Sequence, residues 1–449
     1  MMIIEFVIKN YRSLKDETVL SLEASGAKGK SDNIAEVQTK NGKKFRLLKT
    51  AVIYGPNASG KSNIIRAYWA FRQMVATSFR NDVNEDLSIA EPFELDSSSS
   101  KEPTEFTLNF IARDQQQYIY YISFSKSEGI LEEYLKYYPE KTSKLIFRRR
   151  GRKLVSFNDA IFKSKNIRDA LNPKRLFLSE LGNSGEIYWE NLRNDIVLGT
   201  SALNTSINGM LPYFMFNAKR IFEKTDPESQ AIKENVIKLI QLSDLGIKGL
   251  DLVEEVTLLK QNSSVNDFED EYKETKKEKR FKTFHDVFLN DSIVGTITFD
   301  LLNQGSAGTF ALLGLSTEII RALHTPAGKT IWVDEIDNSL HPLMCRFLIS
   351  LFNHPLSNPN NAQLIFATHE STLLEKNTFR KDQIWITSKD KYGVTKLYSV
   401  QDLVIEGLRD EIPFDKWYLS GKFGGLPKIN DMDFIYKRNE LTTHGQEKK

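Results

Sequence analysis

The stretch "AVIYGPNASGKSNIIRA", residues 51–67, decides the fold. A short apolar run ends at Gly55, a glycine-bracketed loop follows, and a helix is predicted to open on Lys61 and Ser62. "GPNASGKS" fits the pattern G-x-x-x-x-G-K-[ST] in full. In such a loop the backbone N–H groups surround phosphate oxygens, the lysine faces the β and γ phosphates, and the serine hydroxyl is a ligand for Mg²⁺. The pattern therefore predicts a phosphate site between a buried strand and a helix, and an ordinary glycine-rich turn is the weaker interpretation.

The composition limits the class of protein. The chain has 449 residues, enough for several domains or one large domain with an insertion, and 40% hydrophobic and 27% charged residues are typical of globular proteins. The single cysteine, Cys345, excludes an internal disulfide framework and favours a reducing, cytoplasmic location. No apolar run approaches a membrane span, and the first residues do not resemble a signal peptide, so we expect no membrane partner. A net charge of +2 does not predict a general nucleic-acid surface, although a local basic patch is compatible with it.

The first part of the chain predicts strands around the phosphate loop. Residues 1–10 and 18–24 alternate apolar and polar side chains, and residues 104–124 read as two strands joined by a polar turn. The same antiparallel pattern continues through "GILEEYLKYY" and "KLIFRRRGRKLVSF". Residues 1–155 are therefore predicted to hold the phosphate loop and an antiparallel β lobe.

The middle of the chain, residues 156–290, is predicted to be an inserted, mainly helical lobe. Helical periodicity is clearest over 227–246, which begins near a proline and ends at a glycine. Residues 261–282 are polar and rich in charge, and we favour a solvated loop or an exposed helix there. Strands are predicted again at "KTFHDVFL" and "VGTITFDLL".

The last part, residues 291–449, alternates helices and strands. The patterns predict helices over 308–324 and 341–353 and strands over 329–335 and 363–369. This alternation is typical of a parallel sheet, so the predicted fold class is α/β, with an antiparallel β lobe and an inserted, mainly helical lobe.

Two acids end the stretch "IWVDE" (331–335) and supply the carboxylates that the phosphate loop lacks. Asp334 and Glu335 stand at the carboxyl end of an apolar strand, where ligands of parallel sheets bind. Asp334 is predicted to hold Mg²⁺ through water, and Glu335 to orient or deprotonate an attacking water. Adjacent strand residues point to opposite faces, so two different roles are sterically reasonable. By itself this strand end would be read as two solvated acids, and the phosphate loop makes that interpretation weaker.

Two further elements fit a nucleotide site. His369 in "FATHES" ends the next apolar run; a structural histidine is the usual interpretation, but its place one strand after the acid pair favours a γ-phosphate contact. Ser306 and Gly308 in "NQGSAGTF" lie where a helix is predicted to begin, and a helix N-terminus attracts anions. A capped helix start would use the same residues, so both interpretations remain.

The order of five motifs resembles that of the ATP-binding-cassette (ABC)-type ATPase heads of the SMC, Rad50 and RecF group. These motifs are "NYRSL", "GPNASGKSN", "GSAGT", "VDEIDNSLHP" and "FATHES". More narrowly, the chain resembles the AAA15/OLD-like ATPases of bacterial anti-phage and abortive-infection systems, among them the ATPases of PARIS and of AbiL-type systems. "YLSGKFGGLPKI" (418–429) resembles the C-terminal segment of this narrower group. The motifs cover both ends of the chain, and the middle is similar only in general character.

The resemblance implies a role for each matching residue. It implies a Walker B pair of Asp334 and Glu335 with a D-loop over 337–341, and His369 as the switch histidine. It places Arg12 of "NYRSL" near the nucleotide, although a surface arginine is an equal alternative. The residues of the implied Walker A motif are Asn57, Gly60, Lys61 and Ser62. The implied signature residues, which would reach the γ-phosphate bound to a second copy, are Ser306 and Gly308.

The cofactors and partners implied by the resemblance are ATP, Mg²⁺ and a second copy of the chain, with a higher homo-oligomer also open. In the first hypothesis the chain is the ATPase sensor and scaffold of an anti-phage system, which controls a separate toxin or Toprim-like nuclease effector and responds to a phage-encoded trigger. In the second it is a RecF- or Rad50-like repair ATPase that acts on nucleic acid, although no long coiled coil is visible. In the third it is a nuclease that uses the acids of "NDMDF" (430–434), which no further acid cluster accompanies.

Overall fold

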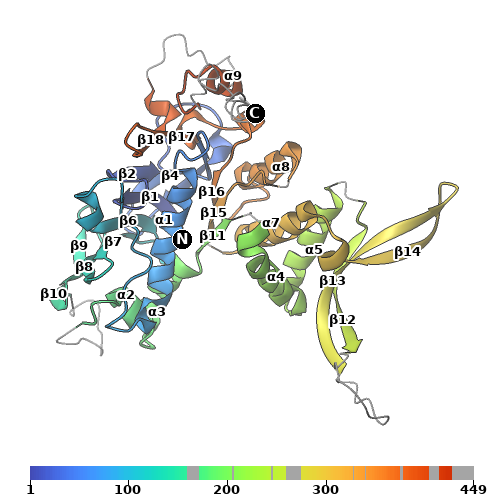
Figure 1. Cartoon of the computed structure of the whole chain (residues 1–449), viewed down its shortest axis with the longest axis horizontal. Helices are drawn as coiled ribbons and strands as arrows, with labels where there is room; N and C mark the ends of the chain where they lie inside the picture. The colour runs from blue at the N-terminus through green and yellow to red at the C-terminus, as the bar shows by residue number, and fades with distance from the viewer. Residues whose placement is uncertain are drawn as a thin grey trace, which may run out of the picture.

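In the computed structural model, the apolar run before the phosphate loop lies inside a six-stranded sheet (Figure 1). The structure describes residues 1–158, 171–204, 207–243, 246–258, 275–326, 328–338, 340–374, 378–403 and 414–426. Five strands of this central sheet are parallel and β18 is antiparallel. Most of these strands are buried on both faces, which explains their continuous apolar sequences. In spatial order the strands are β11 (Thr200–Asn204), β15 (Thr330–Asp334), β16 (Gln363–Ala367), β5 (Thr50–Tyr54), β17 (Ile384–Lys389) and β18 (Thr395–Ser399).

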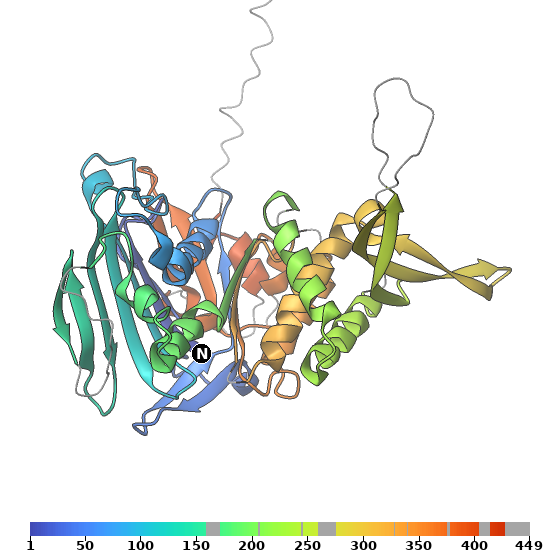
Figure 2. The ribbon, with the colours of Figure 1, turned by 90° about the horizontal axis from the view of Figure 1, so that it is seen from below.

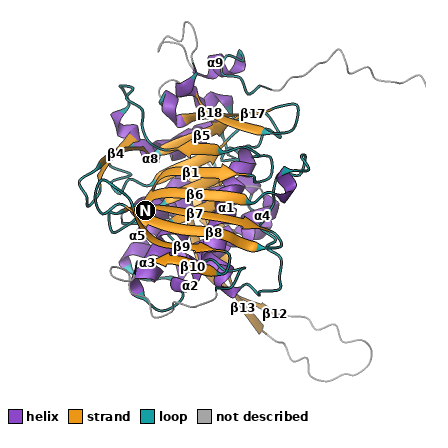
Figure 3. Ribbon diagram, turned by 90° about the vertical axis from the view of Figure 1, so that its left-hand side faces the viewer, coloured by secondary structure: helices purple, strands orange, loops and turns teal. Residues whose placement is uncertain are grey.

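A seven-stranded antiparallel sheet forms the β lobe, seen face on in Figure 3. Its inner strands alternate buried and partly exposed side chains, as expected when one face packs on a core. Its strands, in spatial order, are β10 (Lys153–Phe157), β9 (Lys144–Arg150), β8 (Gly129–Tyr137), β7 (Gln117–Ser125), β6 (Thr104–Ile111), β1 (Met2–Lys9) and β2 (Thr18–Ser21).

Helix α1 (Lys61–Thr77) joins the two sheets through an aromatic cluster. Tyr68 of α1 stacks on Trp332 of β15 with ring centroids 4.3 Å apart, and Phe6 of β1 meets Tyr68 edge to face at 5.2 Å. Such pairs add to the free energy of burying the rings. The helix that begins at the phosphate loop is therefore fixed against both sheets. Two shorter helices pack beside it, α2 (Phe177–Leu181) and α3 (Ile187–Val197).

A second lobe projects from this head and carries a β arm (Figures 1 and 2). Helices α4 and α5 pack against α7, and the arm is a three-stranded antiparallel sheet in the order β12-β13-β14. The elements of this lobe are α4 (Ile207–Glu223), α5 (Pro227–Gln241), β12 (Gly249–Leu258), β13 (Thr275–Leu289), β14 (Ser292–Asp300), α6 (Leu301–Gln304) and α7 (Ala307–His324). The remaining elements are β3 (Ile34–Gln38), β4 (Lys44–Leu48), α8 (Pro342–Asn353) and α9 (Phe414–Leu419), besides short 3-10 turns.

The α/β fold class with an antiparallel β lobe and a second, mainly helical lobe is confirmed, and so are the strands and helices expected near the motifs. The prediction for 261–282 was wrong for its last part, because β13 begins at Thr275. Its lysines pair with acids of β12, as in the 2.6 Å contact from Lys282 to Glu255, so the charged stretch is one side of an ion-paired ladder. Residues 261–274 and 430–434 lie outside the described residues.

Six strands among the described residues were not predicted from the sequence, namely β3, β4, β11, β12, β17 and β18. Within the stretch predicted to be helical, β11 runs beside β15 at the edge of the central sheet, and α2 and α3 pack against α1 in the head. The boundaries 1–155, 156–290 and 291–449 stay a proposal. No helix among the described residues combines the length and apolar character needed to cross a bilayer.

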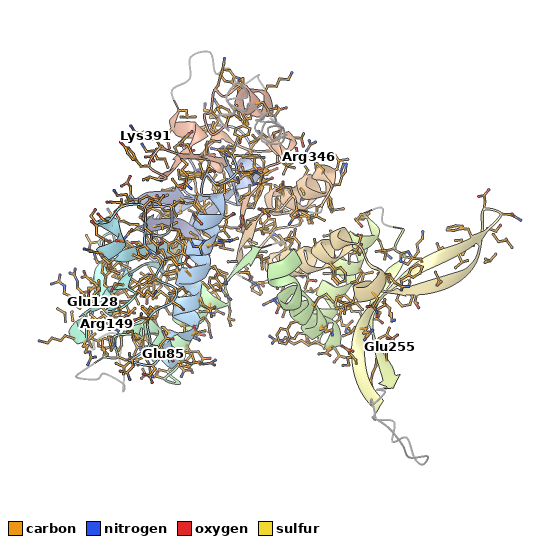
Figure 4. All side chains as sticks on the ribbon, in the orientation of Figure 1. Glu85, Glu128, Arg149, Glu255, Arg346 and Lys391 are labelled. Atoms are coloured by element: carbon orange, nitrogen blue, oxygen red, sulfur yellow. The ribbon has the colours of Figure 1, made fainter. Side chains whose placement is uncertain are left out.

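A buried ion pair anchors α2 to the β lobe. Glu133 and Arg149 are both fully buried, with 3.8 Å between Glu133 Oε2 and Arg149 Nη1. Figure 4 labels Arg149. Glu133 accepts hydrogen bonds from the Tyr120 hydroxyl at 2.8 Å and from the Phe177 and Leu178 amides at 2.7 and 2.9 Å. The carboxylate thus satisfies two amides of the first turn of α2 that have no partner within the helix.

We expect Glu133→Ala to lower the free energy of unfolding by about 3–5 kcal/mol, because it leaves the Arg149 charge buried without its partner. The neighbouring Glu132→Ala removes a partly exposed pair with Arg148 and should cost less than about 1 kcal/mol. Urea denaturation followed by tryptophan fluorescence measures both. Equal effects of the two substitutions would contradict this account.

Candidate active site

The order of the parallel strands brings three motifs together. β15, β16 and β5 are neighbours, and their carboxyl ends lead into Asp334, His369 and the phosphate loop. The phosphate loop is far in sequence from the other two motifs: Ser62 and Asp334, which are in contact, are 272 residues apart, and Lys61 and His369 are 308 residues apart. Ligands of parallel sheets bind at this edge.

Lys61 is the charged centre of the loop. Its ammonium donates hydrogen bonds to the Gly55 and Pro56 carbonyls at 2.7 and 3.1 Å, and it lies 3.3 Å from His369 Nδ1. Only 4% of the residue is exposed. Burial lowers the pKa of Lys61 to about 8, although the carboxylates of the acid pair partly offset this effect. A nearby anion would relieve this desolvation.

His369 is held by its neighbours as a neutral ring. Burial, and then the charge of Lys61, lower the pKa of the imidazole below its usual value. Its backbone amide donates to Asp337 Oδ2 at 3.4 Å. A neutral imidazole beside the lysine can exchange a hydrogen bond with a bound phosphate without adding charge.

Ser62 and Asp334 form the second contact across the site. The serine hydroxyl donates to Asp334 Oδ1 at 3.1 Å, and the carboxylate is almost fully buried. Burial raises the pKa of Asp334, although the serine hydrogen bond and nearby cations oppose the shift. A hydroxyl and a carboxylate are the hard oxygen ligands that Mg²⁺ takes, so these two side chains fit that ion.

Glu335 follows β15 in an unusual backbone conformation. Its φ is 55°, in the left-handed region that a glutamate rarely adopts, and Ala58 in the phosphate loop has a φ of 61°. Such conformations cost on the order of 1–3 kcal/mol and persist where the surrounding structure imposes them, often at functional sites. Strand β15 ends at Asp334, and this backbone conformation turns the chain at Glu335.

The phosphate loop is braced by residues that the sequence analysis did not single out. Thr395 Oγ1 donates to the Ser59 carbonyl at 2.8 Å, and it lies 2.7 Å from Ser13 Oγ. Ser13 in turn accepts from Asn63 Nδ2 at 2.7 Å, and Ser59 Oγ lies 2.6 Å from Thr387 Oγ1. Ser13 belongs to the quoted motif "NYRSL" and could have been noticed there, whereas the threonines of β17 and β18 lie in no motif.

The same threonines explain the two motif glycines. A Cβ at Gly55 would lie 2.1 Å from Thr387 Oγ1, and a Cβ at Gly60 would lie 2.2 Å from Thr395 Oγ1. The φ values of 152° and 109° also favour glycine at both positions. At these two positions the loop is therefore packed against β17 and β18 too closely for a side chain.

Part of the C-terminal stretch 418–429 also supports the loop. Tyr418 donates to the Gly425 carbonyl at 3.2 Å, and its ring lies 5.4 Å from that of Tyr54, the last residue of β5. A Cβ at Gly425 would lie 2.5 Å from Ile386 and 3.8 Å from the Gly55 Cα. Residues 427–429 lie outside the described residues.

Arg12 lines the same cavity as Asp334 but is already paired. Its guanidinium meets Glu91 at 2.5 Å, and its backbone has a φ of 51°. A cavity of about 270 Å³ is lined by Arg12 together with Arg66, Trp69 and Asp334. The structure therefore places Arg12 near Asp334, and its contact with a nucleotide stays a prediction.

The remaining predicted residues are on the phosphate loop and at the start of α7. Asn57 is exposed on the phosphate loop. Ser306 is the N-cap of α7, and its hydroxyl accepts from the Thr309 amide at 3.1 Å. Among the described residues no hydrogen bond joins Ser306 or Gly308 to the phosphate loop, so their contact with a nucleotide stays a prediction.

A buried charge network fixes the position of α7. Glu318 accepts from Asn217 Nδ2 at 2.8 Å and from Ser201 Oγ at 3.2 Å, and it pairs with Lys329 at 3.3 Å. Ser201 lies on β11 and Lys329 directly precedes β15. The helix that begins at Ser306 is therefore tied to the strand that ends at Asp334.

Comparison with known proteins identifies the family. Residues 51–375 match the family described as "AAA domain, putative AbiEii toxin, Type IV TA system". The chain belongs to this AAA-domain family. The match spans the phosphate loop, the acid pair and His369, and the protein is a P-loop ATPase.

Other comparisons of this AAA-domain protein are more distant. The SMC head domain from Thermotoga maritima is 13% identical with a TM-score of 0.38, and the match covers 90% of this chain and 100% of that one. The recombination mediator protein RecF with ATP, from the RecFOR pathway, is 13% identical with a TM-score of 0.37, and the match covers 88% and 97%. No curated protein matches this sequence.

We expect nucleotide affinity to fall as pH rises above about 8, because the AAA-domain protein must carry a charged Lys61 to hold phosphate. Phosphate charge raises the pKa of this lysine in the complex. The affinity for nucleotide is therefore at its maximum at pH values below the pKa of Lys61 in the nucleotide-free protein. Above it, affinity declines by up to about tenfold per pH unit until the pKa of the complex is reached.

Titration calorimetry between about pH 7 and about pH 9.5 measures this decline and the accompanying proton uptake. Lys61→Ala should bind weakly at every pH and lose the dependence. Constant wild-type affinity across this range would contradict the interpretation.

Proposed function

We propose that this protein binds ATP with Mg²⁺ and hydrolyses the γ-phosphate at a site completed by a second copy of the chain. The observation that carries the proposal is the pair of contacts Lys61–His369 and Ser62–Asp334, which gather a phosphate-binding lysine, a metal-binding hydroxyl and a carboxylate at one sheet edge. These groups have the chemistry that phosphoryl transfer requires.

Each residue has a distinct part in the proposed reaction. Lys61 and the amides of the loop at Asn57 and Gly60 neutralise the phosphate charge, which is the largest electrostatic demand of the transition state. Ser62 and Asp334 hold Mg²⁺, which bridges the phosphate oxygens and offsets their charge. In this proposal Glu335 activates the attacking water, and His369 contacts the γ-phosphate. Both roles fit the positions of these residues beside the phosphate loop.

The second copy is proposed because one chain offers two complementary half-sites. The N-terminus of α7, with Ser306 and Gly308, is an anion-binding element that makes no hydrogen bond to its own phosphate loop. A γ-phosphate bound between Lys61 of one copy and Ser306 of another would favour the closed dimer over separate chains. Arg12 would lie at the edge of the same nucleotide.

We further propose that ATP binding controls a separate toxin or nuclease in an anti-phage system, with a phage-encoded trigger. The support is the family description, which names a putative toxin of a Type IV TA system, together with the anti-phage resemblance of the motifs. A RecF- or Rad50-like action on DNA is the alternative.

The composite site can be tested with two inactive variants. Lys61→Ala lacks the lysine and Ser306→Arg blocks the helix N-terminus, so each alone should lose at least about 90% of ATP turnover. Co-expressed with different affinity tags and purified through both, the mixed dimer has one complete site and should recover about half of wild-type turnover. Each variant co-expressed with itself is the control. Failure of the mixed dimer to exceed these controls would contradict a shared site.

The controlled partner can be tested with Glu335→Gln, which should retain ATP and stay closed because water activation is lost. Capture from the native host with ATP, followed by mass spectrometry and a nuclease-sensitive absorbance measurement, identifies what is bound. A stoichiometric protein with a toxin or nuclease domain supports the defence role, and Lys61→Ala should not capture it. Nucleic acid without a protein partner would favour the repair alternative.

A further inference from the structure

The end of the arm exposes apolar side chains far from the head. The hairpin of β13 and β14 projects away from the helices that support it, as Figure 2 shows. Residues 287–298 are all exposed, and large apolar side chains are frequent among them. Their exposed fractions are Val287 38%, Phe288 62%, Leu289 63%, Ile293 62%, Val294 57% and Ile297 45%. We call these six residues the arm patch.

The area of the arm patch is large for a surface in water. At about 150 Å² for a large side chain, six roughly half-exposed residues present on the order of 500 Å². By the pairing with β13, Val287, Leu289 and Ile297 lie on one face of the hairpin, and Phe288 and Ile293 lie on the other. Apolar surface exposed in this amount usually marks an interaction surface.

The outer strand of the arm has an open edge. Among the described residues β14 pairs with β13 alone, so the amides and carbonyls on its other edge face outward. No charged residue occurs from Ser292 to Phe299, and a bulge at Val294 is the only irregularity of the ladder with β13. Edge strands are normally protected by charges, prolines or bulges, and Gly295–Phe299 has none of these.

The other edge strand of the same sheet is protected. β12 carries Asp251, Glu254 and Glu255, the last of which is labelled on the arm in Figure 4. Against a second β12 these acids would meet like charges, which destabilises strand pairing. The contrast shows that the missing charge on β14 is a property of that strand and not of the whole arm.

The charges at the end of the arm do not favour a polyanion as the occupant. No lysine or arginine occurs from Thr283 to Asp300, whereas Asp286 and Asp291 lie in the hairpin. Nucleic acid and anionic membranes are bound through basic groups, and acids repel them. A neutral, apolar strand edge fits another neutral, apolar strand edge.

We propose that the arm patch and the free edge of β14 bind the same surface of a second copy, as an antiparallel β14–β14 pair about a two-fold axis. With the axis at Ile297, the sequence "GTITF" places Ile297 opposite Ile297, Thr296 opposite Thr298 and Gly295 opposite Phe299. β-Branched and threonine pairs across antiparallel strands are stabilising, and a glycine leaves room for an aromatic ring. The contact does not involve nucleotide, and it is distinct from the proposed closure at the phosphate loop.

Cross-linking tests this pairing directly. The only native cysteine, Cys345, is buried, so a single introduced cysteine reports its own surroundings. Ile297→Cys would face itself across the axis, near the separation that a disulfide spans. Without nucleotide, mild oxidation should convert most of this variant to a covalent dimer. Val253→Cys, on the protected β12 edge at 38% exposure, should remain monomeric on the same non-reducing gel. A monomeric Ile297→Cys, or equal cross-linking of both variants, would overturn the proposal.

Sedimentation provides the second test and separates this contact from ATP-driven closure. Nucleotide-free wild type and Lys61→Ala should both be dimers, because the arm does not need ATP. Ile297→Lys places two ammonium groups at the axis and should weaken this dimer at least about tenfold, while Val253→Lys should not. The Ile297→Lys chain should keep ATP-dependent association, which reports that it is folded. A nucleotide-free wild type that is monomeric, or an Ile297→Lys chain that dimerises as wild type does, would overturn the proposal.

Discussion

The buried ammonium of Lys61 is the constraint on which the rest of the site depends. A lysine that is 4% exposed, with two carbonyls and a neutral histidine as its near neighbours, is costly in the free protein. The cost is offset when a polyanion is bound, because phosphate charges restore what solvent no longer supplies. The strand order places Asp334 and Ser62 beside the loop, where they would hold a metal ion that balances the remaining phosphate charge.

A loop that holds a charge in this way must be rigid, and its rigidity comes from distant parts of the chain. Ser13 near the N-terminus and Thr395 near the C-terminus form a hydrogen bond beside the loop. Gly425 packs close to Gly55, the first glycine of the loop. Each supports a backbone with little freedom to rearrange, which suits a site whose polar groups must be oriented before the ligand arrives. The described part of the C-terminal stretch therefore supports the phosphate loop, although it contains no motif that binds phosphate.

The two proposed contacts between copies would act together. A permanent pairing of the arms would keep two heads at a high effective concentration, so that ATP need only close them. Closure would then be an intramolecular population shift, governed by the differential affinity of ATP for the open and closed arrangements. The network around Glu318 links the helix that begins at Ser306 to the strand that ends at Asp334, so the two half-sites of a chain would move as one body.

The sequence by itself determined the phosphate loop, the acid pair, the alternating strands and helices, and hence the fold class, because these depend on local pattern and spacing. It did not reveal β11 inside a helical stretch, the strand over 275–282, or the threonine braces, because pairing with remote strands decides these features. The meeting of Lys61 with His369, and the open edge of β14 beside the protected edge of β12, were likewise decided only by the tertiary structure. The physical reason is that strand order and strand edges are relations between segments far apart in the chain, and no single segment contains them.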